Sequence, residues 1–533
     1  MKLTPKETIE KGKAVLGLEF GSTRIKAVLT DSSHAVIAQG SHSWENRYEN
    51  GYWTYSNDDI IQGLQACYAS LKDDVRKKYN VTLTNIAAIG ISAMMHGYIA
   101  LDKNDELLVP FRTWRNTTTG PAAEELSNLF GVNIPQRWSV AHLYQAILNR
   151  ETHVPDIAFL TTLSGYVHYL LTGKKVLGIG DASGMFPVDS ATGNYDARMF
   201  GQFAELISIK QYAWSLYDLM PKVLKAGDHA GSLTQAGAKL LDPEGDLLPG
   251  IPFAPPEGDA GTGMVATNSV RPGTGNVSAG TSIFGMLVLE QELSKAYKII
   301  DMVTTPSGEP AAMVHCNNCT SEVNAWVALF SEFGRRMGVD MDEGDVYHTL
   351  FSAALDGEAD CGGLLSYNLL SGEPVLDSDG GRPLFVRTIN AKMNLPNFMR
   401  AQLYSCLAAL KSGFDVLRAE GVQPKQITGH GGYFKQEGIG QRFLAAALNS
   451  PVTVMETAAE GGAWGMSILA RYLVDGKGRT LADYLDHSVF RSCKSVTIEP
   501  DEEEVKGFEI YLERFLGGLE TETTAERTIP DVE

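Results

Sequence analysis

The chain contains one short pattern twice: an apolar stretch, a turn of glycine and small hydroxyl residues, and a second apolar stretch. The first copy spans residues 15–29 with Gly21 at its turn, and the second spans residues 276–289 with Gly280 at its turn. A glycine at the tip allows the backbone to expose successive amides, and serine or threonine hydroxyls add donors without bulk. Two such tips facing each other across a cleft can hold a polyphosphate. The duplication therefore predicts an enzyme that uses a nucleotide.

Each copy alone is also typical of an ordinary β-hairpin, so the interpretation depends on the pair. The sequence contains neither the G-x-x-x-x-G-K-[ST] pattern of P-loop proteins nor the G-x-G-x-x-G pattern of dinucleotide-binding folds. Both of those fold classes therefore lose support.

The composition is that of a large, ordinary globular protein. With 533 residues, the chain is too long for one hydrophobic core and predicts two large domains. Its 44% apolar and 20% charged residues are unremarkable for such a protein. The net charge of −19 argues against a nucleic-acid partner or an anionic membrane surface. Backbone amides and a metal ion can still form a local phosphate site.

The sequence shows no sign of a membrane span or an export signal. No apolar run approaches about 18 residues, and residues 1–13 are charged rather than apolar. Six cysteines in this length do not suggest a disulfide framework, so we expect a cytoplasmic protein. Cys316 and Cys319 have C-x-x-C spacing, but no second Cys/His pair lies at zinc-site distance. We interpret them as small core or cleft residues.

Hydrophobic periodicity predicts a mixed α/β layer. Residues 35–40 and 87–92 are short apolar runs typical of strands, and residues 58–75 have the three-and-four spacing of an amphipathic helix. Residues 322–337 and 397–418 are predicted to be helices in the second half. Three antiparallel strands, a helix and a further strand differ from a regular βαβ repeat.

A carboxylate lies shortly before the second glycine turn. Transfer of a phosphoryl group to an alcohol needs a phosphate cradle, Mg²⁺ ligands, a carboxylate base and an acceptor pocket. Residues 257–263 place Asp259 among small residues that allow a substrate to approach closely. Asp259 could take the proton of an attacking hydroxyl, or it could be an ordinary turn aspartate.

At this point the residues resemble the FGGY family of carbohydrate kinases, members of the actin-like ATPase superfamily, over residues 14–473. Residues 17–26 look like the first phosphate motif of the family, and residues 278–282 look like the second. Asp259, after Gly258, stands where the family has the aspartate that activates the sugar hydroxyl. Residues 429–433 and 460–465 are similar to its adenosine-binding turns.

Within this family the chain is most similar to xylulokinases. Residues 90–97 resemble their sugar-pocket segment, residues 114–116 stand at their W-N-D position, and residues 181–184 match their S-D-A-[AS]-G stretch. His96 and Asn116 both offer a donor and an acceptor to sugar hydroxyls. The resemblance implies a substrate site formed by Met95, His96, Trp114, Asn116 and Asp259, with Asp259 as the catalytic base.

The resemblance also implies a fold and two cofactors. The fold class is α/β, with two actin-like (ribonuclease H-like) domains around a central cleft. We expect an extension at 1–13, a sugar-binding domain at 14–287, an ATP-binding domain at 288–480 and a helical, acidic tail at 481–533. The implied cofactors are ATP and Mg²⁺. The expected ATP contacts are Gly21, Ser22, Thr23, Lys26, Gly280, Thr281, Ser282, Gly431, Gly432, Gly461 and Gly462, and Glu19 is the expected metal ligand.

Three positions depart from the family pattern. Glu19 replaces an aspartate expected to hold Mg²⁺ through water, Met94 replaces a glutamine, and Asn116 replaces an aspartate. Loss of one polar contact to a buried hydroxyl changes selectivity by roughly 1–3 kcal/mol. The class of sugar kinase is therefore better supported than xylulose as its substrate.

Three alternatives remain open. The chain could phosphorylate another sugar or polyol such as L-ribulose or L-xylulose, act as an actin- or Hsp70-like ATPase, or be a catalytically weak sugar-binding regulator. The expected partner is a small sugar, with no nucleic acid and no membrane. The sequence does not define the oligomeric state, and a homodimer is one option.

Overall fold

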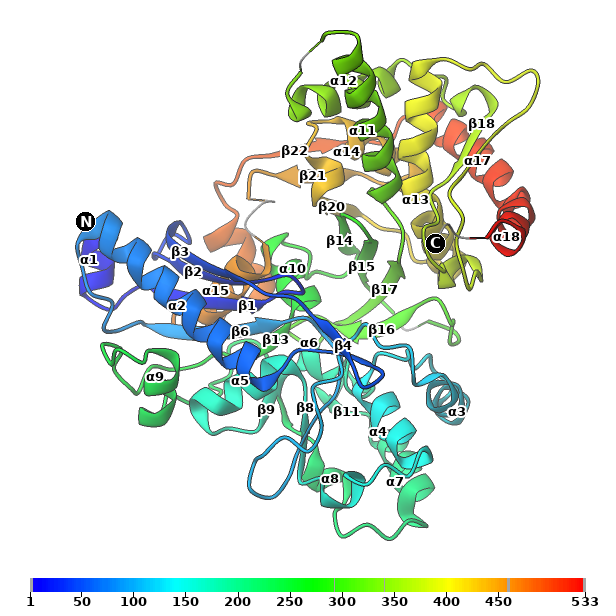
Figure 1. Cartoon of the computed structure of the whole chain (residues 1–533). Coiled ribbons are helices and arrows are strands. Elements are labelled where there is room, and N and C mark those ends of the chain that lie inside the picture. The colour runs from blue at the N-terminus through cyan, green and yellow to red at the C-terminus, as the bar shows by residue number, and fades with distance from the viewer. Residues whose placement is uncertain (1–2, 292, 340, 458–460, 531–533) are drawn as a thin grey trace.

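The computed structural model describes residues 3–291, 293–339, 341–457 and 461–530. Two large β-sheets organise the chain (Figure 1). We call the five-stranded sheet, with the elements packed on it, the first lobe, and the seven-stranded sheet, with its helices, the second lobe. The five-stranded sheet consists, in spatial order, of β13 (Glu257–Gly258), β6 (Ala88–Ala93), β1 (Val15–Phe20), β2 (Arg24–Thr30) and β3 (Val36–Ser43). The seven-stranded sheet consists, in spatial order, of β16 (Asp301–Thr304), β17 (Pro310–Cys316), β15 (Ile283–Val288), β14 (Thr274–Ala279), β20 (Gln426–His430), β21 (Val452–Met455) and β22 (Ser495–Ile498).

Helices and short strand pairs complete both lobes. The helices are α1 (Pro5–Glu10), α2 (Asn57–Tyr79), α3 (Gly120–Phe130), α4 (Ser139–Leu148), α5 (Leu163–Thr172), α6 (Ile179–Ala182), α7 (Ala197–Ser208), α8 (Leu216–Leu219), α9 (Gln235–Leu241), α10 (Asp259–Ala266), α11 (Ser321–Arg336), α12 (Glu343–Leu355), α13 (Leu395–Ala419), α14 (Ile439–Leu448), α15 (Gly461–Asp475), α16 (Leu481–Tyr484), α17 (Glu502–Gly517) and α18 (Leu519–Thr528). The short strands are β4 (Arg47–Glu49) with β5 (Tyr52–Thr54), β7 (Ile99–Leu101) with β8 (Phe159–Thr161), β9 (Val176–Gly178) with β12 (Lys222–Leu224), β10 (Val188–Asp189) with β11 (Asn194–Tyr195), and β18 (Leu364–Tyr367) with β19 (Leu384–Arg387). None of the helices in the described ranges is long and apolar enough to cross a bilayer.

The two sheets share one strand topology. In the first, β1, β2 and β3 are antiparallel, β6 is parallel to β1, and β13 is parallel to β6. In the second, β14, β15 and β17 are antiparallel, β20 is parallel to β14, and β21 is parallel to β20. The repeated sequence pattern is therefore the opening hairpin of each sheet, which confirms the α/β fold of two duplicated domains. The helices predicted at 58–75, 322–337 and 397–418 are also confirmed, as α2, α11 and α13.

The second hairpin lies in the second lobe. The sequence-based boundary between 287 and 288 leaves β14 and β15 in the first domain, whereas their hydrogen-bonded neighbours β17 and β20 belong to the seven-stranded sheet. The turn-rich segment before β14 is the chain's crossing between the sheets. We therefore propose that the second domain begins at β14 rather than after it.

The chain returns to the first lobe after β21. Helix α15 packs on β1 and β6 and against α10. A Cβ atom on Gly17 would lie 2.0 Å from the carbonyl oxygen of Ala463, so this close approach requires glycine. The predicted tail at 481–533 contains α17 and α18, but β22 within it pairs with β21 and completes the second sheet.

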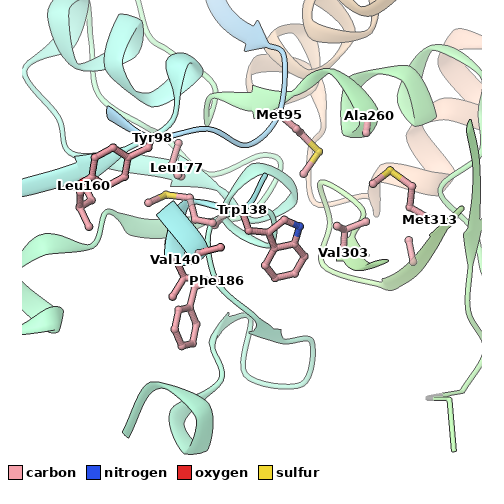
Figure 2. Close-up of a cluster of buried hydrophobic side chains, with 14 of the residues drawn as sticks. Met95, Tyr98, Trp138, Val140, Leu160, Leu177, Phe186, Ala260, Val303 and Met313 are labelled. Carbon is pink, nitrogen blue, oxygen red and sulfur yellow. The ribbon is translucent and has the colours of Figure 1, made fainter. Parts of the chain in front are cut away.

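A continuous apolar cluster joins the lobes. It contains Met95 and Trp138 from the first lobe together with Val303 on β16 and Met313 on β17 (Figure 2). Strand β16 is further tied to the first lobe, because the Thr304 N–H donates to the Ser183 hydroxyl oxygen at 3.0 Å. The lobes therefore meet at the edge strand of the second sheet.

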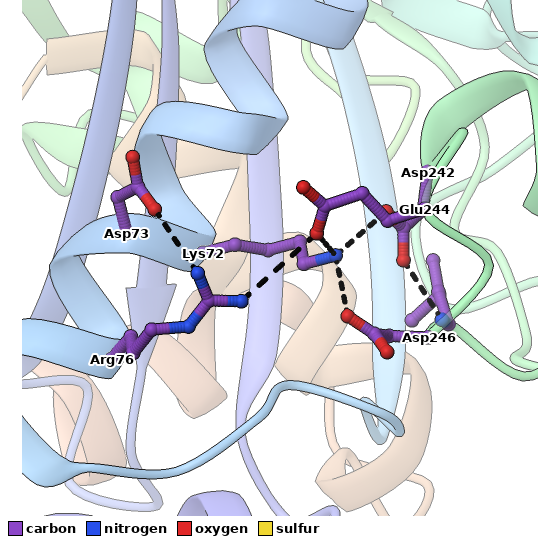
Figure 3. Close-up of polar contacts among 7 residues, drawn as sticks. Lys72, Asp73, Arg76, Asp242, Glu244 and Asp246 are labelled. Carbon is purple, nitrogen blue, oxygen red and sulfur yellow. Dashed lines mark hydrogen bonds and ion pairs between the residues drawn. The ribbon is translucent and has the colours of Figure 1, made fainter.

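One buried cation fixes the outer face of the first lobe. Lys72, on α2, is 5% exposed and its ammonium group contacts three carboxylates of the loop after α9 (Figure 3). The distances from Nζ are 2.8 Å to Asp242, 2.8 Å to Glu244 and 2.7 Å to Asp246. These contacts hold the loop against α2.

Candidate active site

Asp259 is the first residue of α10 and follows β13 directly. Its side chain is exposed, whereas the flanking Gly258 and Ala260 are buried. Asp259 Oδ1 accepts the Met95 N–H at 3.1 Å and the Ala260 N–H at 3.0 Å. These two bonds fix one carboxylate oxygen and leave the other available to a ligand.

The surroundings of Asp259 favour a protonatable carboxylate. Desolvation by the surrounding protein is the main cause that raises the pKa of Asp259 to about 7. The nearby carboxylates of Glu19 and Asp181 act in the same direction, and the hydrogen bonds from the Met95 and Ala260 amides oppose them. A base with a pKa near neutral pH is suited to taking a proton from an alcohol.

We expect the activity to depend on pH through Asp259. Because a base must be deprotonated, kcat/KM should fall about tenfold per unit as the pH decreases below about 7, and should level off above it. The measurement is kcat/KM for the acceptor between pH 5 and 9, with thermal unfolding at each pH to exclude loss of fold. A profile that is flat down to pH 5 would contradict this assignment.

Two glycines allow neighbouring segments to approach Met95 and His96 closely. A Cβ atom on Gly258 would lie 2.0 Å from Met95 Cγ, and one on Gly184 would lie 2.6 Å from His96 Nδ1. Neither position can carry a side chain without moving these residues. The structure thus brings Asp259, Met95 and His96 together, and their contact with a sugar stays a prediction.

His96 is buried and neutral. Desolvation, with the charge of Arg137, lowers its pKa well below the usual value. Its Nδ1 lies 3.2 Å from the Gly184 carbonyl oxygen, which can only accept, so Nδ1 carries the proton. Nε2 is therefore an acceptor. The ring also stacks on Trp138, at 6.3 Å between centroids.

Trp114 extends the site toward the second lobe. It is half-buried and meets His315, on β17, edge-on at 6.5 Å between ring centroids. His315 stacks on Phe284, on β15, at 6.4 Å. Desolvation and the charge of Arg137 lower the pKa of His315 to about 3, so this imidazole is neutral. His315 could not be predicted from the sequence, because a single histidine on an apolar strand carries no signal of its own.

Asn116 is engaged by the main chain. Its Oδ1 accepts the Trp53 N–H at 2.8 Å, and its Nδ2 donates to the carbonyl oxygens of Trp53 at 2.9 Å and Thr113 at 3.0 Å. The residue is 2% exposed. Trp53 on β5 and Thr113 thus use both amide hydrogens, and a direct sugar contact of Asn116 stays a prediction.

Glu19 lies on β1 and reaches the first turn of α15. Its Oε2 accepts the Ala463 N–H at 3.2 Å and lies 4.0 Å from Lys26 Nζ. Desolvation raises the pKa of Glu19, while Lys26 and the Ala463 amide oppose this. A Cβ atom on Gly462 would lie 2.5 Å from Glu19 Oε1, and one on Gly461 would lie 3.7 Å from Lys26 Nζ. Gly461 and Gly462 therefore border the first hairpin; Glu460, from the same motif, lies outside the described residues.

The residues around Glu19 fit Mg²⁺ only in part. Within the described ranges, no group of three or more His, Cys, Asp or Glu side chains could hold a metal ion. Mg²⁺ often needs only one or two carboxylates, since waters and substrate phosphates supply the other oxygens. The desolvated carboxylate of Glu19 is a suitable donor of that kind.

The tip of the first hairpin is anchored through its carbonyl groups. Trp44 Nε1 donates to Gly21 O at 2.7 Å, and the Tyr55 hydroxyl donates to Ser22 O at 2.6 Å. The side chains of Ser22 and Thr23 stay partly or fully exposed. Their hydroxyls are therefore accessible to a ligand.

The second hairpin lies against the turn that contains Gly431 and Gly432. Ser278 on β14 is paired with His430 on β20. Gly431 has φ of 100°, and a Cβ atom there would lie 2.4 Å from Ala279 O. Only glycine fits this conformation and approach. The structure thus brings the predicted second phosphate motif and one predicted adenosine turn together.

A duplicated two-lobed α/β fold, with a carboxylate at a helix start beside the point where the lobes meet, is the arrangement expected of an actin-like phosphotransferase. The sequence matches the descriptions "FGGY family of carbohydrate kinases, N-terminal domain" over residues 14–265 and "FGGY family of carbohydrate kinases, C-terminal domain" over residues 275–474. The chain belongs to the FGGY family of carbohydrate kinases, and is an ATP-dependent phosphotransferase that acts on a small sugar or related molecule.

Individual relatives are distant. A xylulose kinase from Haemophilus influenzae is 22% identical over 534 residues, which cover 95% of this chain and 99% of that protein. The structure of ligand-bound xylulose kinase from Lactobacillus acidophilus is similar with a TM-score of 0.77 at 18% identity, over 96% of this chain and 99% of that one. A gluconate kinase structure from the same organism has a TM-score of 0.77 at 17% identity, over 97% and 99% of the two chains. At these identities the structural likeness shows the fold alone.

Proposed function

We propose that this kinase transfers the γ-phosphoryl group of MgATP to a hydroxyl of a pentulose, with xylulose as the first substrate to test. The observation that carries the proposal is the position of Asp259, whose accessible carboxylate is held beside Met95 and His96 with a pKa of about 7. The similarity to a xylulose kinase over nearly the whole chain supports the choice of pentulose.

In the proposed mechanism the sugar lies in the first lobe, against His96 and Trp114. Nε2 of His96 accepts a hydrogen bond from one hydroxyl, the flat face of Trp114 packs on C–H groups, and Asp259 takes the proton of the attacking hydroxyl. His315 and Phe284 would cover this pocket from the second lobe. The two lobes together would exclude water, which otherwise competes as acceptor.

The proposed nucleotide site uses both hairpins. The phosphates would lie between Gly21, Ser22 and Thr23 and the Gly280, Thr281 and Ser282 turn, with adenosine near Gly431 and Gly432. The position of Gly462 close to Glu19 and of Gly461 close to Lys26 favours a place near the phosphates for these two glycines. Mg²⁺, held near Glu19, would neutralise charge on the phosphate oxygens.

The substrate is tested by ADP release with MgATP across pentuloses, hexuloses, polyols and gluconate. Stimulation by a pentulose, with a phosphorylated product detected by mass spectrometry, is the expected result. If only another class of acceptor stimulates ADP release, that class replaces pentuloses as the proposed substrate. ADP release that is independent of every acceptor would favour a partner-driven ATPase, and sugar binding without turnover would favour a regulator.

We expect Glu19→Asp to keep or raise kcat at saturating Mg²⁺, because a carboxylate remains for the metal. Glu19→Gln, which keeps the length but removes the charge, should reduce kcat about 100-fold or more. The measurement is kcat as a function of Mg²⁺ concentration for both variants. If Glu19→Asp is as damaging as Glu19→Gln, the reach of the side chain to the Ala463 amide matters rather than its charge.

A further inference from the structure

The loop between β17 and α11 is hydrogen-bonded to the turn of the second hairpin. Thr320 donates to Gly280 O through its amide at 3.0 Å and through its hydroxyl at 2.7 Å. The Cys319 amide donates to Thr281 O at 2.9 Å. These three bonds occupy the carbonyl groups of Gly280 and Thr281, so the conformation of the hairpin tip depends on the position of this loop.

Asn318 ties the same loop to a distant turn at residues 370–373. Its Oδ1 accepts the N–H groups of Leu370 at 2.9 Å and Ser371 at 3.1 Å, and its Nδ2 donates to Ser371 O at 3.1 Å. Asn318 is 5% exposed. One side chain thus bridges two segments that are far apart in the sequence.

Glu373 completes the connection from the turn. Its Oε2 accepts the N–H groups of Asn317 at 2.9 Å and Asn318 at 3.2 Å, and the Asn318 side-chain amide at 3.1 Å. Glu373 is fully buried. The carboxylate therefore fixes both the backbone and the side chain of Asn318.

The C-x-x-C segment of the sequence forms most of this loop. Cys316 and Cys319 are buried free thiols. The Cys319 carbonyl oxygen accepts the Asn368 side-chain amide at 3.0 Å, which adds a further link to the same region. The asparagines between the cysteines are hydrogen-bonded to the 370–373 turn, whereas Cys319 and Thr320 are hydrogen-bonded to the hairpin.

We propose that Asn318 is a positioning residue for nucleotide phosphates: with Glu373 it sets the loop that holds Gly280 and Thr281, and so the alignment of their amides and hydroxyls toward a di- or triphosphate. The proposal rests on the proposed phosphate role of this hairpin. It does not require Asn318 to touch the nucleotide.

Asn317 provides a matched control. Its side chain is exposed and makes one bond to the same turn, from Nδ2 to Gly372 O at 2.7 Å, whereas the buried side chain of Asn318 bonds to Leu370, Ser371 and Glu373. The same substitution, Asn→Ala, can therefore be made at two adjacent positions, only one of which bridges to Ser371 and Leu370 from a buried site.

The experiment is calorimetric titration of wild type, Asn318→Ala and Asn317→Ala with MgATP, MgADP and adenosine. Asn318→Ala should weaken binding of ATP and ADP at least tenfold and leave adenosine within about twofold. Asn317→Ala should leave all three within about twofold. Unchanged ATP affinity in Asn318→Ala, or a parallel loss of adenosine affinity, would overturn the proposal.

A second variant covers the case in which Asn318→Ala does not fold. Thr320→Val keeps the shape of the side chain but removes the hydroxyl that donates to Gly280 O. It should weaken ATP and ADP about threefold or more without affecting adenosine, and no effect would count against the proposal. A wild type that binds ATP but phosphorylates no acceptor would refute the proposed function alone, since the binding comparison does not depend on transfer.

Discussion

Asp259→Asn is expected to reduce phosphoryl transfer to the acceptor by about 10²- to 10⁴-fold while ATP affinity stays within about threefold. Asparagine can keep the bonds from the Met95 and Ala260 amides through its carbonyl oxygen, so the start of α10 should be preserved. What it cannot do is accept the proton of the attacking hydroxyl. The loss should therefore appear in kcat rather than in the KM for ATP.

The measurement is acceptor-dependent ADP release, with ATP binding determined separately. Asp73→Asn, an exposed aspartate on α2, is the matched control and should leave kcat unchanged. Retention of more than one tenth of wild-type kcat in Asp259→Asn would remove Asp259 from the role of base. Loss of ATP affinity in parallel would instead indicate a structural defect.

Local sequence patterns predicted the parts of the fold that depend on short segments. The two hairpins form where apolar runs flank Gly21 and Gly280, because the turn needs glycine and each strand needs a buried face. The predicted helix at 58–75 has its buried residues at the spacing that the sequence displays. The small residues around Asp259 and the resemblance to the FGGY family single out this carboxylate in the sequence, and its role as the base stays a prediction.

Long-range packing was beyond such patterns. Helix α15 returns to β1 because Gly17 lets the backbone of Ala463 approach, and no periodicity records which sheet a helix covers. His315 enters the site only because β17 lies opposite Trp114. Asn116 is of a residue type that can bind sugar hydroxyls, yet its side-chain amide is hydrogen-bonded to the main chain of Trp53, a residue distant in sequence. Partners of this kind are set by tertiary contacts rather than by residue type.

Lys72→Met is expected to reduce the free energy of unfolding by about 3–5 kcal/mol. Methionine fills a similar volume but leaves Asp242, which is 2% exposed, as a buried carboxylate without its cation. Glu244 and Asp246 are more exposed and can turn toward water, so most of the loss should come from Asp242. The Leu247 N–H, which donates to Asp242 Oδ2 at 2.9 Å, cannot replace a full charge.

Two comparison variants separate this charge effect from loss of packing. Arg76→Met removes a neighbouring cation on the same helix, but its side chain is 53% exposed, so it should cost less than about 1 kcal/mol. Adding Asp242→Asn to Lys72→Met removes the stranded charge and keeps an acceptor for Leu247, so it should restore at least half of the loss. The measurement is urea unfolding followed by both circular dichroism and tryptophan fluorescence, which also tests whether the lobes unfold together. If the double variant is no more stable than Lys72→Met, the effect comes from packing of the lysine stem against α2 and the loop, and the buried-charge explanation is wrong.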